Sequence, residues 1–319
     1  MKTLTAALLC LLPLATHAAT YDSGSDGSDG ALVFAPYLGH VVFNPDDFDP
    51  ALDADRDGVY HFTSITIGRD TYVRLGANML GHRPVIWLSQ GDIVIDGGLD
   101  LYGGSQYNSY GYYTDPGAGG FPGGAPGMPG AGPGASQDLD KPSAVHSIEY
   151  PNSTAKAYGN AFLVPALGGS GEAGNSNGRS IYQGGGAIIL ASNTKIFLDD
   201  GGIASTSDGG SGGAIRIIAP YIESDSGGIY VGDDLDRLGR IRLEYFTLTG
   251  RLWYSDAPGV TFHSTPGPAV IEPPIKIVSV DENPIPQKPG ASGPEPDYTI
   301  TTPGEVTVTV EAKGIPLGT

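Results

Sequence analysis

The sequence predicts an all-β protein: a right-handed parallel β-helix with a long Gly/Pro-rich insertion and a partial immunoglobulin-like C-terminal segment. One observation behind this prediction is a unit of roughly 26 residues that recurs along the chain, the length of one structural repeat. Another is that each unit consists of short runs rich in Ile, Val, Tyr and Phe between turn-forming residues, which is typical of strands. We find no segment with the apolar spacing of an amphipathic helix.

The expected strands lie on both sides of the insertion. Before it they fall in "VYHFTSITI" (59–67), "TYVRL" (71–75), "PVIWLSQ" (84–90) and "DIVIDGGLDLYGG" (92–104); after it they fall in copies that begin at Gly185, Gly212 and Gly239. A unit this short cannot bury its own apolar face, so the units are expected to stack, with Ile93, Ile196 and Ile217 in one core. A β-sandwich of hairpin-linked strands is the alternative. Similar sequences at matched positions of the units favour stacked coils over a β-sandwich.

Two details of the repeat predict side-chain environments. Gly202 and Gly228 are expected at equivalent corners, where a positive φ or tight packing excludes a side chain. In "GRIRLE", strict alternation predicts that Ile241 and Leu243 face the core. The same alternation predicts that the charged residues face water: Arg240, Arg242 and Glu244.

Composition divides the chain into segments. We expect a signal peptide at 1–19, an acidic N-terminal segment at 20–58, the β-helix at 59–265 with its insertion at about 105–183, a linker at 266–274, and a partial immunoglobulin-like segment at 275–319. The last segment contains two expected strands, which cannot form a stable domain alone. Either the immunoglobulin-like module is truncated, or its strands dock on the helix or on a partner.

The first residues have the layout of a secretory signal peptide. Lys2 precedes an apolar run that is too short to span a bilayer, and small residues follow it. This predicts a secreted, extracellular or cell-surface protein of a bacterium, without a membrane span in the mature chain. Cys10, the only cysteine, lies inside the signal peptide, so the mature protein is expected to fold without disulfides.

The charge of the chain narrows its partners. The formal net charge is −18, which repels nucleic acid and anionic lipid. Nucleic-acid binding is therefore excluded, and polysaccharide or other cell-surface components are the expected partners.

A calcium site is one interpretation of "DADRDG". Asp53, Asp55 and Asp57 alternate before a glycine, as in the first half of a calcium loop, and the Val59 carbonyl would supply a fourth oxygen ligand. However, Ser64 stands where a complete EF-hand loop has a glutamate. The other interpretation is an acidic turn before the strand at Val59. A second acidic stretch, residues 22–30, is expected to be a flexible N-terminus.

Other polar clusters give weaker indications. Asp96, Asp199 and Asp225 fall near equivalent turns of the repeat, so we interpret them as corner residues. Two carboxylate clusters, Asp199 with Asp200, and Asp233 with Asp234 and Asp236, could serve a glycosidase or a calcium-dependent lyase. The histidines outside the expected signal peptide show no ligand spacing: His40, His61, His82, His146 and His263. The tyrosines of "YNSYGYY" (107–113) either contact a sugar or pack the insertion against the coil.

Several stretches together carry a resemblance to a known group. "SDGAL" (28–32), "VYHFTSITI", "GDIVIDGGLDLYGG", "GGAIRIIAP" and "GRIRLE" resemble exported, glycine-rich bacterial surface proteins of β-helical type, described as adhesin-like or pectate-lyase-like and mostly uncharacterised. The resemblance covers about residues 25–250. It implies an extracellular β-helix, and it supplies no catalytic motif. Longer members continue into immunoglobulin-like modules after a segment similar to "IKIVSV", which supports the truncation interpretation.

Two classes of function follow from these features. The favoured one is a secreted or cell-surface structural or adhesion protein without a catalytic site. The alternative is a carbohydrate-active β-helix enzyme, either a polysaccharide lyase or a glycoside hydrolase.

Overall fold

A computed structural model describes residues 20–54, 57–105, 114–135, 161–174, 182–232, 238–255, 260–270, 275–284 and 304–312. The described chain is nearly all β. Its helical turns are η1 (Pro45–Asp47) and α1 (Ala77–Leu80), and none of its helices has the length and apolarity needed to cross a bilayer. The predicted signal peptide lies outside the described residues.

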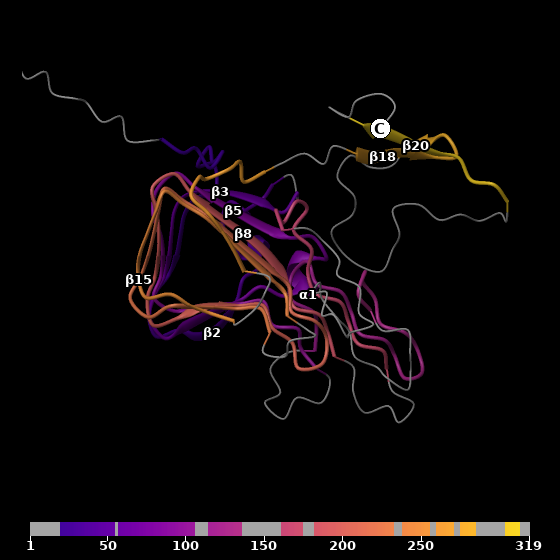
Figure 1. Ribbon diagram of the computed structural model, residues 1–319, viewed down its shortest axis with the longest axis horizontal. Coiled ribbons are helices and arrows are strands. Elements are labelled where there is room, and N and C mark those ends of the chain that lie inside the picture. Colours follow the sequence, from indigo (N-terminus) through magenta and orange to yellow (C-terminus); the bar gives the residue numbers. More distant parts are fainter. Residues whose placement is uncertain are drawn as a thin grey trace, which may run out of the picture.

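Two parallel sheets enclose the core (Figure 1). The larger sheet contains β1 (Gly30–Phe34), β3 (Val59–Ile67), β5 (Val85–Ser89), β6 (Ile93–Ile95), β8 (Ala187–Ser192), β9 (Lys195–Leu198), β11 (Ala214–Ile218), β12 (Tyr221–Ser224), β14 (Arg240–Glu244), β15 (Thr247–Gly250) and β17 (Val260–His263). The smaller sheet contains β2 (Gly39–Val42), β4 (Thr71–Arg74), β7 (Gly98–Asp100), β10 (Gly202–Ala204), β13 (Gly228–Tyr230) and β16 (Trp253–Tyr254).

The larger sheet is curled around the long strand β3. Residues 59–62 of β3 pair with β5, whereas residues 65–67 pair with β6. The sheet therefore has two sides. We call the side with β5, β8, β11, β14 and β17 the first side, the side with β6, β9, β12 and β15 the second side, and the smaller sheet the third side (Figure 1).

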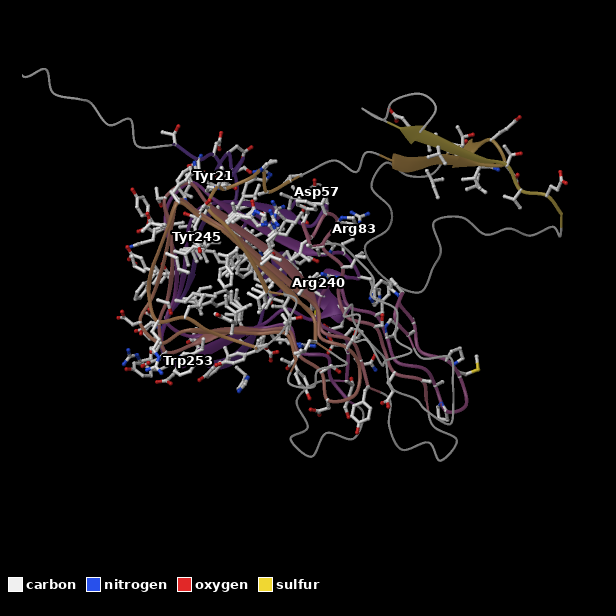
Figure 2. The ribbon with its side chains drawn as sticks, in the orientation of Figure 1. Tyr21, Asp57, Arg83, Arg240, Tyr245 and Trp253 are labelled. Atoms are coloured by element: carbon white, nitrogen blue, oxygen red, sulfur yellow. The ribbon has the colours of Figure 1, made fainter. Side chains whose placement is uncertain are left out.

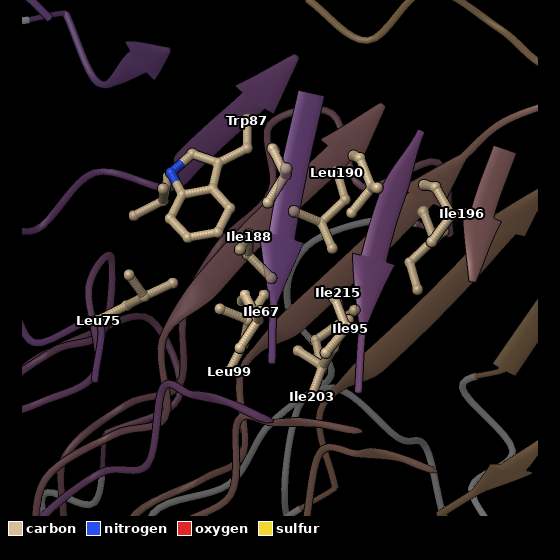
Figure 3. Packing of buried hydrophobic residues seen from close by; sticks show 14 of the residues in the cluster. Ile67, Leu75, Trp87, Ile95, Leu99, Ile188, Leu190, Ile196, Ile203 and Ile215 are labelled. Atoms are coloured by element: carbon tan, nitrogen blue, oxygen red, sulfur yellow. The ribbon is translucent and has the colours of Figure 1, made fainter. Parts of the chain in front are cut away.

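The strand register matches the repeat alignment predicted from the sequence. Ile93 pairs with Ile196, and Ile196 in turn pairs with Ile222. Every unit passes through the first, second and third sides before the next unit begins, so equivalent residues form columns. As expected, Ile93, Ile196 and Ile217 are fully buried in one apolar core, part of which Figure 3 shows.

Aromatic residues close the N-terminal end of this core. Phe43 packs against Trp87, with ring centroids 5.2 Å apart, and it also contacts Tyr60 at 5.4 Å. Phe43 follows β2, which pairs in parallel with β4, while β1 pairs with β3. Neither β1 nor β2 was among the strands that the sequence analysis expected.

The N-terminal acidic stretch is bound to the sheet rather than flexible. Ser23 is buried, and its hydroxyl donates to the Ser89 carbonyl at 3.0 Å. The hydroxyl of Ser25 donates to the Phe62 carbonyl at 2.8 Å. The expectation of a flexible segment was wrong because serine side chains bond the backbone of β3 and β5, which pattern analysis of a polar run does not show.

Glycine in and around the insertion permits direct packing of backbone on backbone. The amide of Phe121 donates to the carbonyl of Gly169 at 2.9 Å, the amide of Gly169 donates to Gly185 at 2.7 Å, and the amide of Gly185 donates to Ser211 at 2.9 Å. A Cβ at Gly169 would overlap the Ser211 carbonyl oxygen. The described parts of the insertion therefore form a layer of laterally bonded extended segments at the corner between the third and first sides, rather than a free loop.

The charged residues of "GRIRLE" are a correction to the sequence analysis. Arg242 and Glu244 are buried, not solvated. The Nε atoms of Arg216 and Arg242 lie 2.8 and 2.7 Å from the same Glu244 oxygen, Oε1. Alternation does place these side chains on the outer surface of the first side, but other segments cover that surface.

Two distant segments form this cover. The Arg216 guanidinium donates to the carbonyls of Pro268 and Ala269, and the Gly267 amide donates to Glu244 Oε2 at 2.7 Å. In the same way, Arg242 donates to the carbonyl of residue 161 in the insertion at 3.2 Å. We call the covered surface the strapped face. Beside these charged residues, an apolar cluster joins the sheet to its cover; it includes Leu88, Ile189 and Ile218 of the sheet and Leu163, Ala166 and Ala269 of the covering segments.

The C-terminal part forms a separate small sheet. The two expected strands correspond to β18 (Ile275–Val280) and β20 (Val308–Ala312), which pair antiparallel, and β19 (Asn283–Pro284) pairs with β18. Ile277 lies opposite Val310, and both side chains are exposed.

Candidate binding face

The outer surface of the third side is built from one column of aligned residues. The column comprises His40, Tyr72, Gly98, Gly202, Gly228 and Trp253, in the order of the strands. The neighbouring column contains Val73, Leu99, Ile203 and Ile229, all buried in the core. Because successive residues of a strand point to opposite sides, the first column faces outward.

Tyrosine rings flank an open glycine in this column. A Cβ at Gly98 would lie 2.9 Å from Cδ1 of Tyr72, so the Tyr72 ring leans over Gly98. Likewise, a Cβ at Gly228 would overlap the ring of Tyr230, which lies two residues further along the same strand. Gly202 lies between them, and the atoms nearest to its missing side chain are all backbone.

The rings on this surface are exposed. Tyr72, Tyr230 and Trp253 are 43, 45 and 47% exposed, although each belongs to a regular strand. Tyr72 is stacked with His40 at 5.3 Å, the Arg251 guanidinium lies 4.0 Å from the Trp253 ring centroid, and Trp253 points away from the core (Figure 2). We call this surface, from Tyr72 across the glycines to Trp253, the aromatic face.

The three aligned glycines are explained by close packing, not by φ: a Cβ would meet the Tyr72 ring at Gly98, the backbone of Gly228 at Gly202, and the Tyr230 ring at Gly228. A Cβ at Gly202 would overlap the carbonyl oxygen of Gly228, and neither residue has a positive φ. The expectation of equivalent positions at Gly202 and Gly228 is confirmed by their direct pairing. Of the two reasons that we considered, tight packing holds and positive φ does not.

A pocket of about 390 Å³ opens beside the aromatic face. Its lining is Tyr102, Ala204, Thr206, Ser207, Asp208, Tyr230 and Gly232. Burial and a hydrogen bond to the Asp208 carboxylate raise the pKa of the Tyr102 phenol. The Tyr102 phenol therefore stays protonated at physiological pH, and its hydroxyl donates a hydrogen bond to the Asp208 carboxylate.

A buried arginine holds Tyr102 in place. Arg74 is 1% exposed and donates to the Tyr102 carbonyl, and its Nη1 lies 3.5 Å from Oδ1 of Asp100. The same Asp100 oxygen accepts the Tyr102 amide at 2.8 Å. Arg74 also donates to the carbonyls of residues 115 and 116, which fixes the insertion beside the pocket.

The predicted calcium loop is a turn that is held by hydrogen bonds from its backbone amides to its own carboxylates. Asp53 has a φ of 50°, and its carboxylate accepts the amides of Asp57 and Gly58, each at 2.9 Å. The amide of Val59 donates to the Asp57 carboxylate at 2.9 Å. Asp55 lies outside the described residues, within which no three acidic, His or Cys side chains are grouped to hold a metal ion. Calcium binding at these residues stays a prediction.

The acidic corners fall where the repeat alignment places them. The amides of Asp96, Asp199 and Asp225 donate to the last strand residue of the unit before, at Ile67, Ile95 and Leu198. Burial, followed by the nearby charge of Asp199, raises the pKa of Asp96. Arg69 lies 3.3 Å from Asp199 and 3.7 Å from Asp200, so these carboxylates take part in corner ion pairs.

Some predicted residues are not placed, and the aromatic face was not predicted. All of "YNSYGYY" (107–113), His146 and the cluster Asp233, Asp234 and Asp236 lie outside the described residues. The signal for the aromatic face was present in the repeat alignment. There, Gly98, Gly202 and Gly228 occupy one position, and the next unit has Trp253 in place of glycine.

No family model matches the chain, and neither a curated protein nor a solved structure is similar to it.

Proposed function

We propose that the protein is a secreted or cell-surface structural and adhesion protein that binds polysaccharide on the aromatic face. Three stacks of parallel strands with a repeating register support a right-handed parallel β-helix as its architecture. The antiparallel pairing of β18 with β20 is compatible with a partial immunoglobulin-like segment. Export depends on the signal peptide proposed at 1–19.

The observation that carries this proposal is the half-buried Gly202 between the exposed rings of Tyr72 and Tyr230. Glycine inside a strand costs conformational entropy and offers no side chain to pack, so aligned glycines mark places of close backbone approach. Here they leave a flat strip at Gly202, bounded by the rings of Tyr72 and Tyr230. Sugar rings present C–H groups on their faces, and these pack on the electron-rich faces of aromatic side chains.

The strip suits a chain-like ligand. Neighbouring strands lie about 4.8 Å apart, so the column from Gly98 to Gly228 spans roughly 10 Å across the strands. The Tyr72 ring lies at one end of it, over Gly98, and the Tyr230 ring at the other, over Gly228. The aromatic residues recur along this direction up to Trp253. An extended polysaccharide lying across the strands could meet several of these rings, and weak contacts along one polymer add up to useful avidity.

The test is a binding assay on insoluble polysaccharides with purified mature protein. We expect the protein to be retained by at least one polysaccharide, and Tyr72→Ala and Trp253→Ala each to reduce retention at least tenfold. Tyr221→Ala is the matched control because Tyr221 is a 47% exposed tyrosine on β12 of the second side. Equal loss in the control, or no retention of the wild type on any polysaccharide, would contradict the proposal.

A carbohydrate-active enzyme is the alternative, and the same assay separates the two. Glycoside hydrolysis needs two carboxyl groups across the bound bond, one of them a proton donor. On the third side, Asp100 is paired with Arg74, and Asp208 accepts a hydrogen bond from Tyr102. Release of reducing ends or of unsaturated sugars during the binding assay would favour the enzyme over the adhesion protein.

A further inference from the structure

The last unit of the stack ends with half-exposed aromatic side chains in columns that are otherwise buried. In the inward column of the third side, Tyr254 follows Ile229, which is fully buried, yet Tyr254 is 42% exposed. In the inward column of the first side, Phe262 follows Leu243, which is also fully buried, yet Phe262 is 43% exposed. The two exposed rings contact one another, with centroids 5.7 Å apart. The apolar core therefore reaches the surface at its C-terminal end.

The same end of the stack presents strand edges. Among the described strands, β15, β16 and β17 are the last members of their series, and each pairs with a neighbour on one side only. An edge strand is a template for pairing with another chain. Repeat proteins usually cover their terminal unit with a capping segment that has a polar outer face. In the part of the chain that the structure describes, this last unit instead carries the half-exposed rings.

The N-terminal end of the stack is closed and strongly charged. Phe43, Phe48 and Leu52 pack against the core there, and Phe43 and Leu52 are buried. Residues 20–54 contain seven aspartates and no Lys, Arg or Glu, so their formal charge is −7. Residues 245–263, at the other end, contain one arginine, one aspartate and no Lys or Glu, so their formal charge is zero. In a chain with a net charge of −18, a second copy is repelled by the N-terminal end but can approach the C-terminal end.

We propose that the C-terminal end of the stack is a docking surface for a second copy of this chain, joined tail to tail about a two-fold axis. A two-fold contact uses the same surface of both copies, so the rings of Tyr254 and Phe262 pack against the same rings of the partner. The axis also reverses the strand direction, which allows the terminal edges to pair antiparallel. The assembly closes at two copies, with both acidic N-terminal ends pointing outward. This inference does not depend on polysaccharide binding by the aromatic face.

The small C-terminal sheet is the other surface that could cover these rings. Its Ile277, Val308 and Val310 are exposed, and two or three strands are too few for a stable domain alone. However, Figure 1 shows β18 and β20 outside the triangular outline of the stacked coils, and Tyr254 and Phe262 remain half-exposed with this sheet present. The second copy is therefore the occupant that these observations favour.

The experiment is sedimentation equilibrium of the mature protein over about a hundredfold range of concentration. We expect a monomer–dimer equilibrium without larger species. Phe262→Asp places an unpaired carboxylate in the contact, and Arg251→Glu gives the end of both copies a negative charge, so each should weaken dimerisation at least tenfold. The matched controls lie on the second side: Tyr221→Asp alters an exposed aromatic residue of β12, and Lys195→Glu makes the same charge change on β9. Both controls should dimerise like the wild type.

The Arg251→Glu variant keeps the test independent of folding, because the Arg251 side chain is exposed and circular dichroism checks that the fold is kept. A wild type that stays monomeric at every concentration would overturn the proposal, and so would a dimer that neither Phe262→Asp nor Arg251→Glu weakens. Species larger than a dimer would indicate head-to-tail growth and would overturn the two-fold arrangement. A monomer whose melting temperature falls in Phe262→Asp but not in Tyr221→Asp would identify the C-terminal sheet as the cover.

Discussion

The outer surfaces of the third and first sides differ in what their columns contain. On the third side, the outward column contains three consecutive glycines between Tyr72 and Trp253, and the aromatic rings of this surface are exposed. On the first side, the outward columns contain Ile189, Arg216 and Arg242, and the surface is covered by straps. The comparison teaches that alternation within a strand decides the direction of a side chain. Segments far away in the chain decide whether that side chain meets solvent.

The largest effect on stability is expected at the buried ion pairs of Glu244 with Arg216 and Arg242 on the strapped face. Glu244→Ala removes the carboxylate that contacts both Arg216 and Arg242, and the two buried arginines lose this counter-charge. Breaking a buried ion pair from one side costs about 3–5 kcal/mol. We expect a loss of this size in the free energy of unfolding, measured with urea.

Glu223→Ala is the control for that measurement. Glu223 lies 3.4 Å from Lys195 on the second side, and both side chains are solvated. Exposed pairs contribute about 0–1 kcal/mol. Equal destabilisation by the two variants would show that the cluster around Glu244 has no special role in holding the straps.

The next effect concerns the floor of the aromatic face. Gly202→Val should lower the free energy of unfolding by about 1–3 kcal/mol, because its Cβ overlaps the Gly228 carbonyl and the sheet must shift. Gly304→Val is the control, since no atom lies within 4 Å of its Cβ position. If the two variants unfold at the same urea concentration, the close contact at Gly202 is not real.

A smaller effect is expected when acid protonates Glu244. Burial alone would raise the pKa of Glu244, but hydrogen bonds from Arg216 and Arg242, with their charges, outweigh burial and hold the pKa below its usual range. A carboxyl group with a lowered folded pKa contributes stability that is fully present above its unfolded value, about 4.3. That stability is lost as the pH falls through the folded pKa.

The measurement compares wild type with Glu244→Gln. Between pH 7 and pH 3, the unfolding free energy of the wild type should fall more steeply than that of the variant, and the difference should appear below about pH 4.3. Parallel curves would mean that Glu244 titrates alike in the folded and unfolded chain.

The smallest effect concerns calcium at residues 53–59. An incomplete loop should bind calcium at the weak, extracellular end of the range, with a Kd of roughly 10⁻⁴ to 10⁻³ M. At about 1 mM calcium this stabilises the folded chain by only about 0.4–1.4 kcal/mol. We expect calorimetry to show a calcium isotherm for the wild type that Asp55→Ala lacks, and identical isotherms would identify an acidic turn.

Sequence analysis predicted the strands and their alignment because these depend on local composition and on a repeat. The alignment of Ile93 with Ile196 followed from sequence similarity between the units alone, and the structure pairs these residues. The same analysis placed Arg242 and Glu244 in water. It failed there because the covering residues, 267–269, belong to a segment that resembles a linker and whose contacts are not local.

The binding face was harder to predict for another reason. A glycine in a repeat has several explanations, and a positive φ was as plausible as close packing at Gly202 and Gly228. The deciding contacts are three-dimensional: the backbone of the adjacent unit at Gly202, and the Tyr230 ring at Gly228. Nor did the sequence analysis predict that Tyr102, Asp208 and Tyr230 line one pocket, because these residues come from three different units of the chain.

The position of the insertion has a consequence for how the chain assembles. β8, β11 and β14 follow one another at intervals of one repeat, whereas β5 must find β8 across the whole insertion. Closing a loop that is about four times longer costs roughly 1 kcal/mol more entropy. The units before the insertion also pair at intervals of about one repeat, so each half can form by local contacts, and the pairing of β5 with β8 should form last. In a chain synthesised from its N-terminus, the first half can therefore fold before the second half is made, and the two halves join afterwards.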